Sequence, residues 1–402
     1  MSKPSPPFLF GEKPLIVFLA FLNAFVPLSI DLYLPALPGM ARLFTSSDST
    51  AKLTLSLFML TFALSMLIWG PLSDKYGRKS ILRIGILLYI AASLFCALAQ
   101  SMEQLITGRI LEAIGCGAVQ SVSMAIVKDI FREGRIMENV LVWIQSITIL
   151  CPLIAPVLGA FLLQYLPWRG LFYVLAGGAL IGLAFSFALR ETLENALDTS
   201  PFRSLSRIGF VLKNKGFRLL LIVFSIIVMP FMAYLSSSAF IYQNLFGLSS
   251  MQYSYFFAAN AVFAMLGPLA YVRLFRRLPN PLFLNINFGV ISCAGLLILF
   301  LGHLNPWLFA LLFIPITFMG SANRPLSAML MMNQLDSDNG SVVALMSCTA
   351  LLFGSFSMLI CSMEWTSLVH AVGLIGTIGG GTSLALWIYI SKNKIFREPG
   401  RE

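Results

Sequence analysis

The sequence contains few charged residues. Asp, Glu, Lys and Arg make up 11% of its 402 residues, against about a quarter in a soluble globular domain, whereas 58% of its residues are hydrophobic. No segment has the form G-x-x-x-x-G-K-[ST] of a phosphate-binding loop, and the sequence has no cytosolic domain that could house one. The composition therefore excludes a water-soluble fold, and the missing loop excludes pumping driven by ATP in this chain.

Histidine and paired cysteines are also scarce. His303 and His370 are the only histidines, and they fall far apart near the ends of predicted helices. An enzyme embedded in the membrane would need a cluster of histidines or paired acids at one interface, so we expect no enzyme, no metal and no cofactor. The six cysteines fall inside apolar runs without C-x-x-C spacing, which is typical of small buried side chains.

Apolar stretches of about 20 residues, the length of a transmembrane helix, recur along nearly the whole chain. They are continuously apolar rather than alternating, which favours helices over a β-barrel. Because the residues before the first run show no A-x-A-like cleavage site, we interpret that run as a retained helix. We predict an all-α membrane protein with twelve spans, at about 14–36, 51–71, 80–100, 104–126, 140–163, 168–189, 218–240, 252–274, 281–301, 305–331, 341–363 and 366–390.

The positive charges lie almost entirely on one side of this arrangement. If the N-terminus is cytoplasmic, only Arg42, Lys52 and Arg169 of the 27 Lys and Arg residues fall in outer loops. Arg109 and Arg324 fall inside spans, and the remaining 22 are cytoplasmic. Since cytoplasmic loops of membrane proteins are rich in Lys and Arg, both termini are expected in the cytoplasm. The net charge of +10 is then a signal of topology and of contact with the lipid bilayer, and we expect no nucleic acid as a partner.

One interior polar stretch, at about 190–217, is longer than the others and divides the spans into two sets of six. We therefore predict two six-helix bundles, 14–189 and 218–390, with cytoplasmic ends at 1–13 and 391–402. Two such bundles joined in the cytoplasm are typical of a transporter built from parallel repeats. We expect this unit to act as a monomer.

The loop at 70–79 between the second and third spans combines glycines with charges. Gly70 and Gly77 permit a sharp reversal of the chain, and Asp74 can pair with Arg78 or cap a helix. An ordinary positively charged cytoplasmic turn is the alternative interpretation. A shorter basic loop, at 272–277, occupies the matching place in the second half.

Together with twelve spans, the segment 70–79 resembles the signature loop of the major facilitator superfamily. The segments 29–38, 109–115 and 155–160, the last with Pro156 and Gly159, and the residues around 240–249 and Asn260 resemble the Bcr/CflA group of drug:proton antiporters. The resemblance implies a bacterial inner-membrane protein that exports small drugs or metabolites in exchange for protons by alternating access. It also implies antibiotic resistance as the setting, and it assigns the loop 70–79 and the Pro156/Gly159 motif to conformational gating.

Ionisable residues inside a span are expensive and usually functional. Asp31 follows a long apolar stretch, and a carboxylate in such surroundings can exchange a proton with its environment. The alternative is a structural polar group near the helix end. By resemblance, Asp31 is a proton carrier, and the place of a second acid found in some relatives is taken by Asn23.

Arg109 and Glu112 are three residues apart on one face of the fourth span, so they can pair. Arg109 resembles the arginine that relatives use in proton transfer, where it would bias a neighbouring carboxylate because it does not deprotonate itself. Glu112 departs from the family pattern, in which Gln is more usual. It is either a second proton carrier or a counter-ion of Arg109.

The remaining candidates concern the cargo. An apolar cavity with few polar anchors would suit varied small molecules. Arg324 could contact an anionic cargo or extend to the inner membrane surface. A dedicated metabolite or siderophore exporter, or a proton symporter that imports a nutrient, remain alternatives to a drug exporter. The candidate cargo-binding residues are Tyr33, Met59, Phe62, Gln120, Tyr234, Asn260 and Arg324.

Overall fold

The structure is a computed structural model that describes residues 8–9, 11–131, 135–193, 209, 211–334 and 339–397. Most of the expected linker at 190–217, and parts of the expected terminal segments 1–13 and 391–402, lie outside the described residues. Apart from an isolated antiparallel bridge between Phe8 and Leu189, the regular structure of the described residues is helical.

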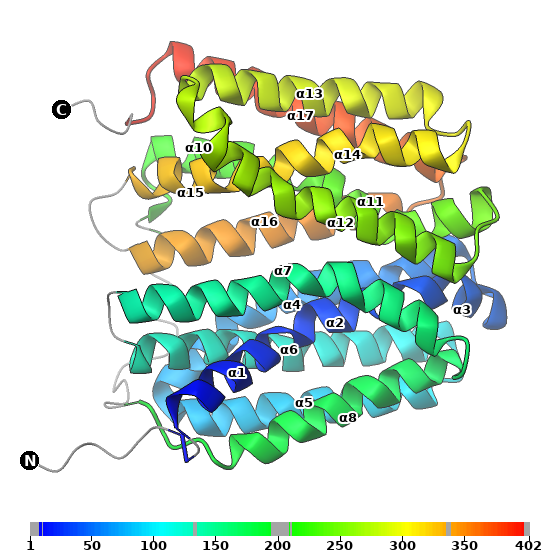
Figure 1. Cartoon of the computed structure of the whole chain (residues 1–402), viewed down its shortest axis with the longest axis vertical. Coiled ribbons are helices and arrows are strands. Elements are labelled where there is room, and N and C mark those ends of the chain that lie inside the picture. Colours follow the sequence, from blue (N-terminus) through cyan, green and yellow to red (C-terminus); the bar gives the residue numbers. More distant parts are fainter. Residues whose placement is uncertain are drawn as a thin grey trace, which may run out of the picture. The chain divides into compact units, whose positions relative to one another are not determined.

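The chain forms two compact units, each a helical bundle (Figure 1). One unit comprises residues 1–46 and 61–203, and the other comprises 47–60 and 204–402. The helices of the first unit, including α4, which contributes to both units, are α1 (Glu12–Asn23), α2 (Phe25–Asp31), η1 (Leu34–Ala36), α3 (Leu37–Leu43), α4 (Asp48–Tyr76), α5 (Arg78–Leu98), α6 (Met102–Ile130), α7 (Arg135–Leu162) and α8 (Trp168–Ser186).

The second unit also consists of long helices, and its first and fourth spans are interrupted. Its elements are α10 (Lys215–Ile226), α11 (Met229–Phe240), the π-helical turn η2 (Ile241–Leu245), α12 (Ser250–Arg273), η3 (Phe275–Arg277), α13 (Asn280–Leu301), α14 (Pro306–Ala322), α15 (Arg324–Met332), α16 (Asn339–Cys361) and α17 (Leu368–Lys392).

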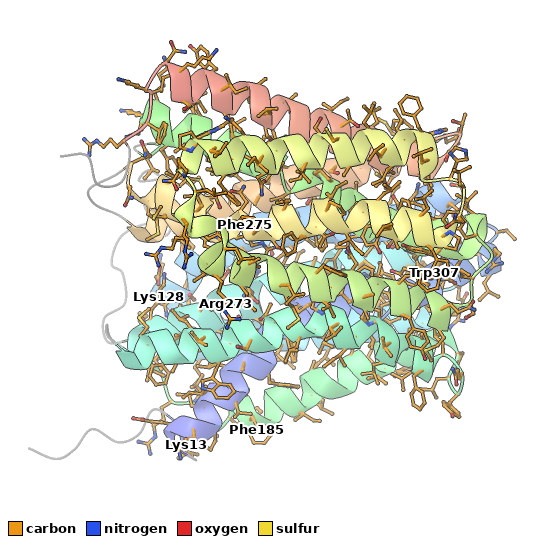
Figure 2. All side chains as sticks on the ribbon, turned by 45° about the horizontal axis from the view of Figure 1, so that its top comes forward. Lys13, Lys128, Phe185, Arg273, Phe275 and Trp307 are labelled. Carbon is orange, nitrogen blue, oxygen red and sulfur yellow. The ribbon has the colours of Figure 1, made fainter. Side chains whose placement is uncertain are left out.

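The described residues contain eleven helical stretches long and apolar enough to cross a bilayer. The remaining predicted span, the fifth at about 140–163, corresponds to α7, a helix of 28 residues whose apolar part is Leu150–Leu162. Many large apolar side chains of these helices are exposed, among them Leu87, Phe185 and Trp307, the last two labelled in Figure 2, as expected for surfaces that contact lipid. The prediction of an all-α membrane protein with twelve spans is confirmed.

Prolines explain why the first span of each unit is broken. Proline has no backbone N–H, so the carbonyl four residues earlier loses its helical partner. Pro27 lies four residues after Asn23, the end of α1, and Pro35 lies four residues after Asp31, the end of α2. In the second unit Pro230 lies four residues after Ile226, the end of α10. The prolines therefore account for the positions of these breaks, whereas α4, α12 and α14 continue through Pro71, Pro268 and Pro315.

The structure places Lys52 differently from the sequence-based prediction. Lys52 was expected in an outer loop, but α4 begins at Asp48, so Lys52 lies in its first turns and is buried. Its ammonium donates a hydrogen bond to the carbonyl of Cys361 in the second unit, to which residues 47–60 also belong. The prediction that Lys52 lies in a loop is wrong because α4 extends beyond its apolar part.

Glycines let α13 and α17 pack with their backbones in contact. A Cβ atom on Gly295 of α13 would overlap the backbone of Gly376 and Thr377 in α17. Gly380 of α17 is equally close to the backbone of Ser292. Small residues at helix interfaces stabilise membrane proteins because close approach increases van der Waals contact.

We predict that Gly295→Ala destabilises the second unit by about 1–3 kcal/mol, because the added methyl group forces the two backbones apart. Gly289→Ala on the same helix is the control, since no atom lies within 4 Å of a Cβ placed there. Its higher helix propensity should leave stability unchanged or raise it by up to about 1 kcal/mol. Thermal unfolding of the purified variants in detergent measures both effects. Equal melting temperatures for the two variants would contradict the predicted close packing.

Candidate functional site

Asp31 is a buried carboxylate at a helix break. It is the last residue of α2 and is only 4% exposed. Among the described residues, no hydrogen bond or ion pair involves its carboxylate, and Cys151 of α7 is its one electrostatic neighbour. An ionised carboxylate in such surroundings is costly. Asp31 is therefore the buried acid of the first unit that no cation neutralises within the part of the chain described.

The helix α7 approaches Asp31 through the predicted Pro/Gly motif. A Cβ atom on Gly159 would overlap the carbonyl oxygen of Leu32, the residue after Asp31. Only glycine fits at this crossing without moving one of the backbones. Pro156 lies one turn earlier inside α7, where it removes a helical hydrogen bond. The motif thus places a helix that lacks a backbone hydrogen bond directly against the break that carries Asp31.

Arg109 and Glu112 form a buried ion pair in α6. Both side chains are fully buried, and the guanidinium of Arg109 contacts the Glu112 carboxylate. The Ser93 hydroxyl of α5 donates a hydrogen bond to Glu112 Oε1 at 2.8 Å. Arg109 also lies over the ring of Tyr33, 4.5 Å from its centroid. The predicted pairing is confirmed, and Arg109 therefore neutralises Glu112.

The ion pair identifies the carboxylate that Arg109 could influence as a neighbouring group. The carboxylate beside Arg109 is Glu112, whereas no described interaction links Arg109 to Asp31. Tyr33, a candidate cargo residue, is fully buried between Arg109 and Phe172. Its ring therefore supports the ion pair.

A second polar cluster joins α1 to α6. The Gln120 side chain donates a hydrogen bond to Asn23 Oδ1 at 2.8 Å, and Asn23 Nδ2 donates to Ser123 Oγ at 3.1 Å. Asn23 also donates to the carbonyl of Leu19 in its own helix. Asn23, at the position predicted for the missing second acid, is thus an uncharged residue that makes three hydrogen bonds. One of them fixes Gln120, another cargo candidate.

The loop after α4 makes the predicted turn, but with one glycine rather than two. Gly77 has a φ of 92°, a conformation that favours glycine, and it separates α4 from α5. Gly70 lies inside α4, where its carbonyl accepts a hydrogen bond from Ser73, so its predicted part in the reversal is wrong. Asp74 and Arg78 form the predicted ion pair.

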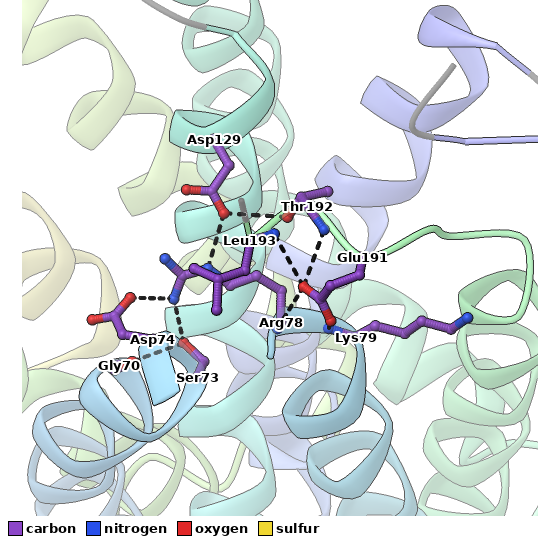
Figure 3. A network of polar contacts seen from close by, with 9 residues as sticks. All are labelled: Gly70, Ser73, Asp74, Arg78, Lys79, Asp129, Glu191, Thr192 and Leu193. Atoms are coloured by element: carbon purple, nitrogen blue, oxygen red, sulfur yellow. Dashed lines mark hydrogen bonds and ion pairs between the residues drawn. The ribbon is translucent and has the colours of Figure 1, made fainter. Parts of the chain in front are cut away.

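Two acidic residues that the sequence did not single out complete this loop (Figure 3). Asp129, at the end of α6, lies 2.9 Å from Arg78 Nε. Glu191 caps α5 by accepting hydrogen bonds from the backbone N–H groups of Arg78 and Lys79, at 2.9 and 3.2 Å. Their signal was weak, because each is a lone acid at the end of a span. The cluster ties α4, α5 and α6 to the residues after α8.

In the second unit, Tyr234 and Asn260 line one pocket. It has a volume of about 270 Å³ and lies between α11, η2, α12 and α14. The ring of Tyr234 stacks on Phe313, with centroids 4.1 Å apart. The sequence named two of its lining residues but missed the aromatic ones contributed by η2 and α14. The described residues that line it are Tyr234, Tyr242, Phe256, Ala259, Asn260, Trp307, Ala310, Leu311, Phe313 and Ile314.

Three other cargo candidates lie outside this pocket. Arg324 is exposed and begins α15, directly after the break at Asn323, and no described residue forms an ion pair with it. Met59 and Phe62 of α4 are buried. The structure therefore brings together only two of the seven predicted cargo residues, Tyr234 and Asn260.

Comparisons with known proteins agree on one protein family. A sequence model described as Major Facilitator Superfamily matches residues 19–358. The MFS-type transporter YdgK of Bacillus subtilis (strain 168), itself uncharacterized, is 33% identical over 257 residues, which cover 62% of this chain and 64% of that protein. The multidrug resistance protein MdtL of Klebsiella pneumoniae (strain 342) is 35% identical over 171 residues, 42% of this chain and 43% of its own. The chain thus matches less than two thirds of the length of these relatives.

Solved structures share the fold at low sequence identity. A bacterial homolog of the human lysosomal transporter Spinster, in an inward-facing and occupied conformation, has a TM-score of 0.75 and 13% identity, with 98% of this chain and 100% of that chain covered. A D-xylose-proton symporter has a TM-score of 0.69 and 14% identity, with 92% and 96% covered. With the sequence match over residues 19–358, these likenesses identify the family: the chain belongs to the major facilitator superfamily of membrane transporters.

Proposed function

We propose that the protein exports small drugs or metabolites in exchange for protons, as a monomeric antiporter of the Bcr/CflA type. Its place would be the bacterial inner membrane, with both termini in the cytoplasm. The similarity to MdtL multidrug resistance proteins supports a drug cargo, over the part of those proteins that aligns. The one-sided distribution of Lys and Arg in the sequence supports the orientation.

The observation that carries the proposal is the environment of Asp31. Its carboxylate is buried with no hydrogen bond or ion pair among the described residues, whereas Glu112 is neutralised by Arg109. Ionising an unpaired carboxylate away from water is costly, so proton release from Asp31 requires access to water or a cationic cargo. Antiport needs such a group, because the proton and the cargo must alternate at one site.

Arg109 and Glu112 act in this proposal as a neutral, rigid pair. Breaking a buried pair leaves an uncompensated charge, so each partner holds the other in its ionised form. Arg109 in turn fixes the ring of Tyr33, two residues after Asp31. The pair therefore shapes the surroundings of the proton carrier without exchanging protons itself.

Conformational change is assigned to two elements of the first unit. The breaks at Asn23 and Asp31, with Pro156 and Gly159 opposite them, allow the first span to bend where the proton binds. The cluster of Asp74, Arg78 and Asp129 holds the other end of the same unit and would be rearranged as transport proceeds.

We predict that Asp31→Asn abolishes uphill export but retains downhill exchange of cargo. The amide has nearly the same shape but does not carry a proton, so energy coupling fails before binding does. Inverted vesicles with an imposed proton gradient and a panel of cationic, neutral and anionic compounds measure this, and wild-type export should collapse to the mutant level with a protonophore. Uphill export by the mutant would assign Asp31 to structure. Sodium-dependent export, or cargo movement in the same direction as protons, would overturn antiport.

Glu112→Gln should lower stability by about 3–5 kcal/mol, because it leaves the buried Arg109 charge without its partner. Where the variant remains folded, the number of protons exchanged per cargo should not change. The double variant Arg109→Gln/Glu112→Gln should regain part of the lost stability, since no buried charge is then unpaired. Thermal unfolding and proton release on cargo addition between pH 6 and 9 test this. Fewer protons per cargo in Glu112→Gln would make Glu112 a second carrier.

Gly77→Ala should slow transport by roughly tenfold, equivalent to about 1.4 kcal/mol, because alanine is strained at a φ of 92°. Its Cβ would also lie 2.7 Å from Glu191 Oε2 and displace the cap of α5. Gly70→Ala is the matched control, because no atom lies within 4 Å of a Cβ placed there. Transport rate at saturating cargo and cargo affinity are measured separately. Equal rates in both variants would reduce the loop to an anchor of membrane topology.

A further inference from the structure

The pocket of the second unit lies near one end of three spans. The π-helical turn η2 ends the span that begins at α10, while α12 and α14 start at Ser250 and Pro306 on the same side. Single π-helical turns within helices are frequent at functional sites. Here the turn supplies Tyr242, which is fully buried at the inner wall.

The pocket contains a polar atom that the described residues leave without a hydrogen-bond partner. Asn260 is 6% exposed, and its Oδ1 is buried without a hydrogen-bond partner in the described part of the chain. The hydroxyl of Tyr242 neighbours that of Tyr234. A buried polar atom without a partner costs about 1–3 kcal/mol, so a ligand that supplies the partner gains that amount.

The remaining wall is aromatic and uncharged. Phe256 stacks on Tyr242 with centroids 4.9 Å apart and meets Trp307 edge to face at 4.7 Å. None of the described residues that line the pocket is charged. An ionised ligand would lose its hydration here without a countercharge, which is costly. The pocket therefore favours neutral compounds with flat apolar faces.

The volume of about 270 Å³ limits the size of the ligand. A cavity of about 150 Å³ lined by apolar side chains accommodates benzene, so this pocket has room for one or two fused rings. The lining agrees with that shape, because it contains two pairs of stacked aromatic rings, Tyr234 with Phe313 and Tyr242 with Phe256.

Exposed apolar side chains lie at the opening of the pocket. Trp307, labelled in Figure 2 at the start of α14, is 74% exposed, and Leu311 one turn later is 64% exposed. Tryptophan near the end of a span is typical of the boundary between lipid and water. Neutral aromatic compounds concentrate at the same boundary, so they would meet the mouth of the pocket at raised local concentration.

We propose that this pocket binds neutral, flat molecules of one or two rings that donate a hydrogen bond, such as phenols and indoles. The donor is received by Asn260, and the rings lie between the aromatic side chains. This inference adds a ligand class to the proposed function. It rests on that function only in the statement that the bound compound is also the transported cargo. Binding by the second unit needs no proton gradient.

The test is equilibrium binding to the full chain in lipid nanodiscs, without a gradient. Radiolabelled 2-naphthol is the probe, and naphthalene and 2-naphthoate are the competitors. We expect 2-naphthol to bind about tenfold more tightly than naphthalene, as one hydrogen bond to a buried acceptor allows, and 2-naphthoate to compete poorly. Equal affinity for all three compounds in the wild-type protein would overturn the proposal without any variant.

Variants then assign the binding to this pocket. Asn260→Leu should remove the preference for 2-naphthol over naphthalene while naphthalene still binds. Ala310→Phe should fill the space and abolish binding of both. Asn287→Leu, a buried asparagine of α13 outside the pocket, is the control and should leave the preference unchanged. A preference that survives Asn260→Leu, or binding that survives Ala310→Phe, would contradict the proposal.

The outcomes separate this inference from the proposed function. Failure of 2-naphthol to bind, with proton-driven export intact and dependent on Asp31, would reject the pocket and leave antiport standing. If the compounds bind as expected but transport is not coupled to protons, the pocket proposal stands and the antiport proposal is rejected.

Discussion

Backbone hydrogen bonding inside a hydrocarbon layer is the constraint on which the rest of this structure depends. A spanning helix satisfies its own N–H and C=O groups, and a proline removes one of these bonds at the carbonyl four residues earlier. Pro27 and Pro35 remove them at Asn23 and Asp31, which are the last residues of α1 and α2. The two polar side chains at the breaks are therefore not scattered along the span. They lie where the backbone is already weakened and where neighbouring helices must compensate.

The first unit contains two buried carboxylates, and their surroundings differ. Glu112 has a guanidinium and a hydroxyl as partners, so its charge is balanced and its position is fixed. Asp31 has neither among the described residues, so its charge depends on what enters its surroundings. The difference arises from neighbours on other helices. It is the physical basis for assigning proton exchange to one acid and support to the other.

The second unit differs from the first in what its helices enclose. Its packing at α13 and α17 is close because glycines remove the side chains from the contact. At α11, α12 and α14 the side chains are large and aromatic, and rings that stack in pairs leave a slot beside Asn260. Close backbone packing and an aromatic pocket therefore occur in the same bundle.

Much of this architecture could be predicted from the sequence, because hydrophobic length and the one-sidedness of Lys and Arg are local properties. Twelve spans and a transporter rather than an enzyme are confirmed by the fold and the family. The pairing of Arg109 with Glu112 was readable because three residues on a helix bring side chains onto one face. The errors also had local causes: α4 extends past its apolar part to include Lys52, and it continues through Gly70.

Tertiary structure decided everything that depends on residues far apart in the chain. The capping of α5 by Glu191 and the contact of Asp129 with Arg78 join segments that no spacing rule connects. The same holds for the crossing of Gly159 with Leu32, and for the pocket that unites Tyr242, Asn260 and Trp307 from three helices. The sequence determines which stretches enter the membrane, because that depends on the free energy of each segment alone. Which polar groups find partners there depends on how the helices pack, and only the folded chain specifies that.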